Sequence, residues 1–517
     1  MSDVVRNYSM GGSPRKRRRD LRRRGGQIGL RVLFLALVCV VGGCWYTRDS
    51  HDMGGLVPAK GALQACVTDV MRKQSMAASS QLWGLLPAES PVRESMRRFA
   101  ENPPLPEWLL NNLSTDVAWF SCDSLSAPED MLVVTKMTRT GCLAAKLARL
   151  DRAVERDHAG GLNLFSVPEA GLYYAVRGRV LLLSRSRSVL VRALTLDKDA
   201  LGEAGLREWR AGAAGADVFG KIEPAPFFFD RLQFSLRLTP GGIDASLSGT
   251  PDETMRKSLD GLLAKASPQT LKTPPAGMVS LSADFGRPLA ETLALAADLY
   301  GQGAPVRAWL SGENAASEGD YGPLSGLARA VVNSAGGGLR VAWQGVDVNE
   351  MVPAPVFTAT IDGGVDPVAA MIQQPPAPPV EPPEIDLLPR VDAEAGVIHV
   401  PLVGGPSIEP SFAVYGEGVA LGTSLTELKA LLAAPAAPAI AEKGNLYLSV
   451  RPGEAVKAAL DAGREFAEFG FVRDETPDSL SAKAQPWVDM AGKIGEVSLL
   501  AAHENGAIRM DARLVMP

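Results

Sequence analysis

The chain has 517 residues, of which 46% are hydrophobic and 21% are charged, and its formal net charge is −5. A chain of this length and composition can bury two or three substantial cores, which excludes a globally disordered protein. The first 31 residues contain ten Lys or Arg and two Asp, a net charge of +8, so the remainder carries −13. This acidic remainder argues against a nucleic-acid partner, because nucleic-acid-binding proteins replace phosphate counterions with surface Lys and Arg.

An uncharged apolar stretch follows the basic run, from Val32 to Cys44. About 12 to 15 apolar residues are fewer than the roughly 20 that cross a bilayer as a helix, and this length is typical of a signal-peptide core. A nucleic-acid-binding tail is the competing interpretation of the basic run. Because the apolar stretch follows at once, we favour export, with the body on the periplasmic or extracellular side of a bacterial cell envelope.

The end of this stretch, Val41-Gly42-Gly43-Cys44, resembles a bacterial lipobox. In such a motif small residues precede the cysteine that becomes diacylated, so Cys44 is the predicted lipidation site of a lipoprotein. The alternative is an uncleaved short membrane anchor, with Trp45 and Tyr46 as interface residues. Both interpretations give the chain a membrane partner through its N-terminus, with residues 1–44 as leader and 45–77 as tether.

Three further cysteines, Cys66, Cys122 and Cys142, lie beyond the leader. In an oxidising envelope Cys122 and Cys142 can form a disulfide. The odd number and the lack of metal-type spacing leave three unconnected thiols as an equal alternative.

The first predicted unit, residues 78–264, contains a hairpin followed by a helix within residues 175–194. Gly178 supplies the positive φ of a short turn, and Ser186 can accept the free N–H groups of the first helical turn. Leu190 and Leu194 then repeat at the i, i+4 spacing of a buried helix face.

This segment recurs at an offset of 238 residues, as residues 413–432, with seven of twenty positions identical. Gly416 and Ser424 occupy the places of the turn glycine and the capping serine. Other pairs follow in the same chain order, including Val117-Ala118-Trp119 with Val341-Ala342-Trp343. Self-similarity in this order predicts an internal duplication.

Both copies also contain a predicted closing hairpin, around Gly241-Gly242 in the first and around Asn505-Gly506 in the second. Residues 265–276 are the predicted linker and 277–517 the second unit. Its proline-rich segment, 374–388, is interpreted as an inserted loop, because such a tract cannot join a central strand. The predicted fold class is therefore α+β, two tandem copies of an antiparallel sheet with helices packed on one face.

A membrane leader followed by duplicated units, each with an Ala-Val-x-Gly hairpin that leads into a Ser-capped helix, resembles a bacterial membrane-anchored envelope family of unknown function. The resemblance covers most of residues 80–517 and rests on turn and core residues. It implies location rather than activity, and it brings no catalytic residues.

Motifs of known chemistry are not found. The four histidines are too scattered for metal-ligand spacing, and neither a zinc signature nor a phosphate-binding loop is present, so no metal and no cofactor is predicted. The glycine-rich segment 334–338 precedes a strand rather than a helix, which removes the helix terminus that a phosphate site needs. We interpret it as a flexible connection.

Candidate contact residues come from two patterns. Trp119 and Trp343 occupy equivalent positions in the two copies and are candidates to line paired pockets, although buried core tryptophans are the favoured interpretation. Arg177 and Arg179 belong to a basic patch that the second copy lacks, and a solvated face is its simpler explanation. Two residues apart, these arginines are predicted to share a strand face.

The sequence thus predicts a non-catalytic cell-envelope lipoprotein or membrane-anchored protein that binds a protein, lipid or envelope polymer. One alternative is an envelope hydrolase that lacks familiar motifs. Another is a periplasmic carrier of an apolar ligand.

Overall fold

The computed structural model is an α+β fold, with eleven α-helices and extensive antiparallel β-sheet in its described residues. Those residues are 47, 51–68, 117–124, 130–148, 154–159, 162–168, 171–225, 229–239, 241–263, 267–313, 322–348, 353–375, 388–401, 408–435, 439–473, 475–504 and 506–517. They form two compact units. Unit 1 takes the described parts of 1–60, 104–120 and 127–207, and unit 2 takes those of 61–103, 121–126 and 208–517.

Unit 1 is built on an antiparallel sheet. Its strands, in hydrogen-bonded order, are β2 (Val117–Cys122, of which 117–120 belong to this unit), β3 (Leu132–Lys136), β7 (Val180–Ser184), β6 (Leu172–Arg177), β5 (Leu162–Val167) and β4 (Glu155–Ala159). Helix α5 (Arg139–Ala148) follows β3, and α6 (Arg187–Leu194) follows β7. The short 3-10 helices η1 (Gly54–Leu56) and η5 (Asp197–Asp199) also lie in this unit.

The predicted hairpin and helix of unit 1 are confirmed. Gly178 has φ 58° in the turn between β6 and β7, and Ser186 is the N-cap residue of α6. Leu190 is fully buried. The expected capping bond is wrong, because the Ser186 side chain bonds no helical N–H; its Oγ lies 2.9 Å from the Ser188 Oγ.

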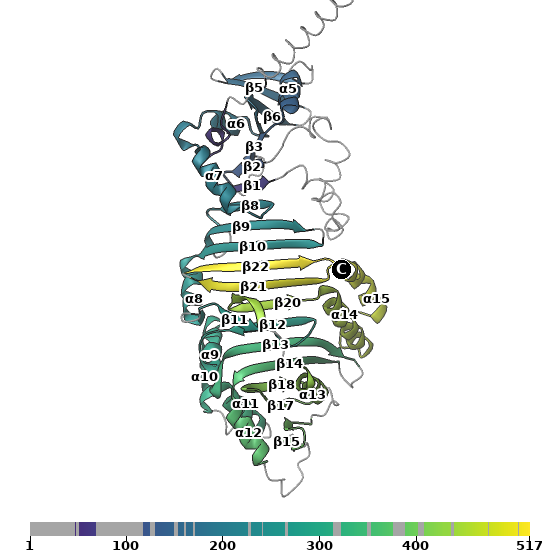
Figure 1. Ribbon diagram of the computed structural model, residues 1–517. Helices are drawn as coiled ribbons and strands as arrows, with labels where there is room; N and C mark the ends of the chain where they lie inside the picture. The colour runs from purple at the N-terminus through teal and green to yellow at the C-terminus, as the bar shows by residue number, and fades with distance from the viewer. Residues whose placement is uncertain are drawn as a thin grey trace, which may run out of the picture. The chain divides into compact units, whose positions relative to one another are not determined.

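Unit 2 contains a longer antiparallel sheet (Figure 1). In hydrogen-bonded order its strands are β1 (Leu63–Thr68), β8 (Val218–Ile222), β9 (Phe229–Thr239), β10 (Gly242–Pro251), β22 (Ala507–Val515), β21 (Glu496–Glu504), β20 (Leu446–Val450), β12 (Val279–Asp284), β13 (Ala335–Asp347), β14 (Ala354–Gly363), β18 (Gly418–Gly422), β17 (Ser411–Tyr415), β16 (Val397–His399) and β15 (Arg390–Asp392). A separate two-stranded sheet pairs β11 (Gln269–Lys272) with β19 (Ala439–Gly444).

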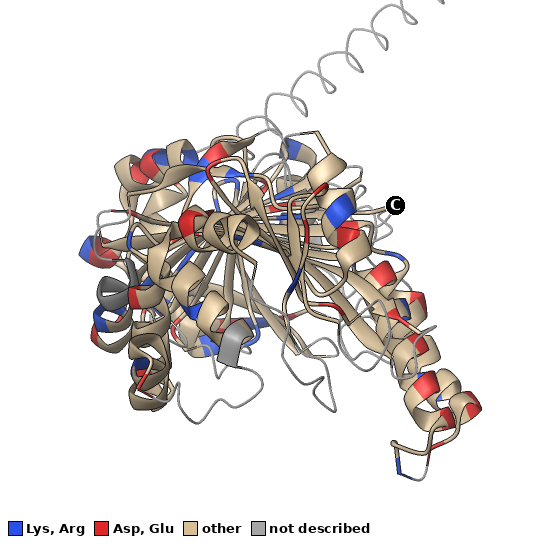
Figure 2. Cartoon of the chain, turned by 90° about the horizontal axis from the view of Figure 1, so that it is seen from below, with Lys and Arg blue, Asp and Glu red and all other residues tan. Residues whose placement is uncertain are grey.

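The helices of unit 2 connect these strands, and α7 runs across the boundary between the units. They are α7 (Gly202–Gly212), α8 (Glu253–Leu263), α9 (Leu289–Leu299), α10 (Gly303–Ser311), α11 (Gly322–Ser334), α12 (Val365–Gln373), α13 (Leu425–Ala433), α14 (Pro452–Glu468) and α15 (Pro477–Ala491). The α14–α15 hairpin, at the right of Figure 2, carries more acidic than basic residues.

Helices cover both faces of the unit 2 sheet, so the predicted single helical face is wrong. Val419 packs in one core with Leu289 of α9 and Val368 of α12. Its neighbour Ala420 points to the opposite face and packs against Leu428 of α13. The sequence indicated only that each helix has one apolar side, and both sides of β18 are apolar.

Several predicted segments form different structures. Residues 63–68 of the predicted tether form β1, which pairs with β8, and the predicted linker contains β11. Both closing hairpins are present, as β9–β10 and β21–β22. Residues 376–387 of the proline-rich segment lie outside the described residues, as do 1–46. No helix of the described ranges is long and apolar enough to span a bilayer.

Candidate functional site

The middle of the unit 2 sheet has one polar and one apolar face. Side chains alternate between the faces of a strand, so the strand registers fix which residues lie side by side. One row across neighbouring strands reads Arg237, Asp244, Arg513 and Ser498, from β9, β10, β22 and β21. A second row on the same face, two residues along each strand, reads Ser235, Ser246, Asp511, Leu500 and Tyr447.

An open basin of about 1640 Å³ lies over this polar face. Its floor is formed by β9, β10, β22, β21 and Tyr447 of β20. Its walls are formed by residues 440–443 of β19, Gly212 at the end of α7, residues 214–216 after it, and Ser267 and Pro268. We refer to this feature as the basin.

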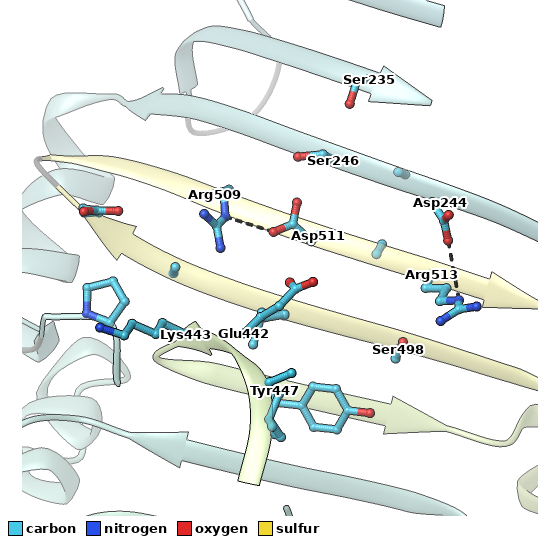
Figure 3. Close-up of a pocket in the computed structure, with 18 of the residues that line it drawn as sticks. Ser235, Asp244, Ser246, Glu442, Lys443, Tyr447, Ser498, Arg509, Asp511 and Arg513 are labelled. Atoms are coloured by element: carbon cyan, nitrogen blue, oxygen red, sulfur yellow. Dashed lines mark ion pairs between the residues drawn. The ribbon is translucent and has the colours of Figure 1, made fainter. Parts of the chain in front are cut away.

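Two ion pairs lie on the basin floor (Figure 3). Arg509 Nε lies 2.9 Å from Asp511 Oδ2, and Arg513 Nε lies 3.5 Å from Asp244 Oδ1. All four side chains are between 31% and 70% exposed. Exposed pairs stabilise a fold by only about 0–1 kcal/mol, so their donors and acceptors can exchange partners at little cost.

Tyr447 forms one edge of the basin floor and is half-buried. Burial together with the nearby Glu496 carboxylate raises the pKa of the Tyr447 phenol. Ser449 Oγ donates to Glu496 Oε1 at 2.7 Å. The phenol therefore stays protonated at neutral pH and can donate a hydrogen bond.

Charged side chains also stand on the wall and at one end of the basin. Glu442 and Lys443 extend over the floor from β19 (Figure 3), and Glu504 lines the basin at the end of β21. The basin thus combines guanidinium and ammonium donors, carboxylate acceptors and the hydroxyls of Ser235, Ser246 and Ser498.

The opposite face of the same strands is apolar. The row behind the basin runs Leu236, Ala245, Ala512, Leu499, Leu448, Leu281 and Val341 across β9, β10, β22, β21, β20, β12 and β13. Each of these side chains is half-buried rather than fully buried.

The size and chemistry of the basin favour an extended polar ligand. Small-molecule pockets are mostly apolar and of about 300–1,000 Å³, whereas this one is larger, open and charged. Guanidinium donors and carboxylate acceptors alternate across the basin floor. Such an arrangement can bind a molecule that presents both hydroxyls and charged groups. No group of three or more His, Cys, Asp or Glu within the described ranges is arranged to hold a metal ion.

The two predicted tryptophans lie in different compact units and in different surroundings. Trp119 of β2 is completely buried, and Trp343 of β13 is half-buried on the apolar face. The burial of Trp119 agrees with a core role, the interpretation that the sequence favoured. Neither residue lines the basin.

The two predicted arginines do not share a strand face. Arg177 ends β6, whereas Arg179 lies in the turn and donates from Nε and Nη2 to the Met137 carbonyl, at 2.9 and 2.7 Å. A neighbouring arginine, Arg187 at the start of α6, pairs with Asp157 and lowers the pKa of that carboxyl by hydrogen bonding. Arg179 is therefore a structural residue that joins the hairpin to the segment before α5.

Cys44 lies outside the described residues. The three cysteines beyond the leader, Cys66, Cys122 and Cys142, are buried and form no disulfide. The Cys122 thiol donates to the Ser124 carbonyl at 2.6 Å and the Cys142 thiol to the Gly178 carbonyl at 3.1 Å, so the disulfide alternative is not what the structure contains. Burial raises the pKa of the Cys66 thiol to about 11.

Sequence reasoning missed the basin residues. The usable signal was Arg509-Met510-Asp511-Ala512-Arg513, a strand with a charged residue at every second position. Such alternation places all three charges on one face. It could not show that Asp244, far away in the chain, lies opposite Arg513.

No family profile and no curated protein matches this sequence. Among solved structures, crystal form I of TP0453 is similar with a TM-score of 0.27 and 8% identity, over 43% of this chain and 88% of that one. Crystal form III of TP0453 gives a TM-score of 0.25 and 7% identity, over 43% and 90%. Likeness at this level carries no argument about fold or function.

Proposed function

We propose that the chain is a non-catalytic, membrane-anchored protein of the bacterial cell envelope, whose basin binds a polar envelope polymer. The observation that carries the proposal is the open, charged basin on the sheet of unit 2. Its exposed ion pairs can open toward a ligand without destabilising the fold. The basic and apolar leader supplies the anchoring part of the proposal.

The basin is tested by co-sedimentation of the purified protein with insoluble cell-wall polymer. The double variant Arg509→Ala/Asp511→Ala removes a donor and an acceptor together and leaves the net charge unchanged. We expect binding to weaken about tenfold or more, because each hydrogen bond to a charged group contributes about 1.5–3 kcal/mol.

The matched control is Arg307→Ala/Asp298→Ala, which removes an exposed ion pair outside the basin. It should bind like the unaltered chain. Equal binding by both double variants would remove the basin from the proposal.

Anchoring is tested separately at Cys44. If the chain is a lipoprotein, Cys44→Ala should abolish both acyl-chain labelling and N-terminal processing. If the leader is instead an uncleaved anchor, the substitution should change neither the labelling nor the processing. In either case the unaltered protein should remain in the membrane fraction.

We also propose that the body is a tandem duplication. It is supported by two equal pairing orders, β2-β3-β7-β6-β5-β4 and β13-β14-β18-β17-β16-β15, and by the matching runs β1-β8-β9-β10 and β12-β20-β21-β22. A chimera in which residues 413–432 replace 175–194 should retain far-UV circular dichroism and cooperative unfolding. Loss of folding in this chimera would count against equivalent copies.

A second candidate function is carriage of an apolar molecule such as a lipid acyl chain. The half-buried apolar row behind the basin favours it, since monomeric proteins rarely leave a continuous apolar face in contact with water. Mass spectrometry of an organic extract of the purified protein tests this candidate, and an extract without lipid would count against it.

An envelope hydrolase is the remaining alternative. Turnover of cell-wall polymer by the purified protein, measured as released reducing ends or amines, would favour it over a binding protein.

A further inference from the structure

We infer that one end of the basin is a subsite for an acidic sugar, a saccharide unit that carries a carboxylate or another anionic group. This inference rests on the proposed function, because it names the ligand chemistry of the same basin. It is carried by the row Arg237, Asp244 and Arg513.

The row places two guanidinium groups on either side of one carboxylate. Asp244 on β10 is in register with Arg237 on β9 and with Arg513 on β22. Neighbouring strands lie about 4.8 Å apart, so the backbones of the two arginines are separated by roughly 10 Å. Asp244 can neutralise only one of them.

The existing ion pair leaves Arg237 available. Arg513 lies 3.5 Å from Asp244, whereas no carboxylate of the described residues pairs with the exposed Arg237. A surplus guanidinium with its fork of N–H donors matches the geometry of a carboxylate or of a phosphate or sulfate ester.

The other groups at this end suit the hydroxyls of a sugar. Ser235 and Ser246 stand beside the row and Ser498 is in register with Arg513; all three line the basin. Asp244 is a carboxylate acceptor for a hydroxyl donor.

Apart from Asp244, the acidic side chains that line the basin lie away from this end. Asp511 is paired with Arg509, Glu504 lies at the far end of β21, and Glu442 shares the β19 wall with Lys443. Among the residues that line the basin, those at the Arg237 end therefore carry a net positive charge, although charges over the whole basin balance.

Titration calorimetry with defined saccharides tests the inference. The probes are trigalacturonate as the carboxylate form, a sulfated heparin disaccharide as the ester form, and maltotriose as the neutral form. We expect an anionic probe to bind, and its affinity to fall as salt is raised. Arg237→Ala should weaken it about tenfold or more.

Arg231→Ala is the matched control. Arg231 lies on the same strand, is exposed and pairs with Glu223, but it does not line the basin. Its variant should bind the anionic probe like the unaltered chain, and circular dichroism of both variants shows whether the fold is kept.

The outcomes separate this inference from the proposed function. Equal affinity for maltotriose and the anionic probes, or an equal effect of the two arginine variants, overturns the acidic-sugar subsite. Absence of saccharide binding overturns it as well. In each case co-sedimentation with cell-wall polymer still reports on the basin, and loss of that binding in the Arg509→Ala/Asp511→Ala variant supports the proposed function by itself.

Discussion

Replacing Asp362 with Asn tests whether the ion pair between Arg340 and Asp362 stabilises strands β13 and β14 of the unit 2 sheet. Arg340 of β13 is only 9% exposed, and its Nη2 lies 2.5 Å from Asp362 Oδ1 on β14. Arg340 Nε also donates to Thr360 Oγ1 at 2.7 Å, and Lys272 Nζ lies 2.9 Å from Asp362. The substitution leaves a buried guanidinium without its carboxylate.

Removing one partner of a fully buried ion pair costs about 3–5 kcal/mol. Asp362 is 39% exposed, so water replaces part of the lost interaction. We therefore expect Asp362→Asn to lower the free energy of opening of β13 and β14 by about 1–2 kcal/mol.

The effect should depend on pH. Burial raises the pKa of Asp362, but the hydrogen bonds from Arg340 and Lys272 outweigh it, and the net pKa lies below its ordinary value of 3.8. A carboxyl with a lowered pKa stabilises the fold above its unfolded pKa, and this stabilisation is lost as the pH falls through the folded pKa. The difference between the two proteins should be full at about pH 6 and shrink below about pH 4.

Native-state hydrogen exchange of peptides from β13 and β14 measures this difference directly. Asp298→Asn is the control, because Asp298 forms an exposed ion pair with Arg307. The reasoning is refuted if Asp362→Asn reduces protection no more than the control, or if its effect is unchanged at acid pH.

Three further predictions concern packing and backbone. The Cys66 thiol is buried and has a pKa of about 11, so it should not react with iodoacetamide at pH 8 until denaturant is added. Mass spectrometry follows the labelling, and prompt labelling of the native protein would contradict the burial of Cys66. Leu428→Ala should lower the free energy of unfolding by about 2–5 kcal/mol in urea titrations, because Leu428 of α13 is fully buried against Ala413 and Ala420 of the sheet. The exposed Leu299 of α9 provides the comparison, and equal losses in the two alanine variants would argue against this core. Gly416→Ala should destabilise the fold by about 1–2 kcal/mol, because Gly416 has φ 60°, and Gly416→Asn should destabilise it less. Thermal melts in which both variants match the unaltered chain would refute the claim that this turn requires a glycine with positive φ.

The sequence predicted what depends on local chemistry. Gly178 and Gly416 adopt the left-handed conformation that their turns require. Leu190 is buried as its spacing indicated, and so is Leu428, which occupies the same place in the second copy. The predicted capping bonds are wrong, because Ser186 and Ser424 occupy the N-cap positions without a side-chain hydrogen bond to a helical N–H. The N-cap position of a serine follows from the local sequence pattern. Its side-chain bond also depends on which other polar groups lie near the hydroxyl, as Ser188 does in the case of Ser186.

The features that depend on distant pairing were not predictable. The glycine-rich segment 334–338 was expected to be a flexible connection, yet Ala335 begins β13. A Cβ atom on Gly338 would lie 1.9 Å from Asp362 Oδ2, so the glycine makes room for the carboxylate that holds Arg340. The basin was missed for a similar reason, since its floor joins the β9–β10 hairpin to the β21–β22 hairpin, which is far away in the sequence.

The pairing of β10 with β22 also sets an order of events during synthesis. Gly242 pairs with Val515, so the edge of β10 stays unpaired until the residues of β22 have been synthesised. An open edge of this length can pair with another nascent chain. The middle of the unit 2 sheet is therefore completed after its other described strands. A product that lacks β22 would leave the edges of both β10 and β21 unpaired, and both can aggregate.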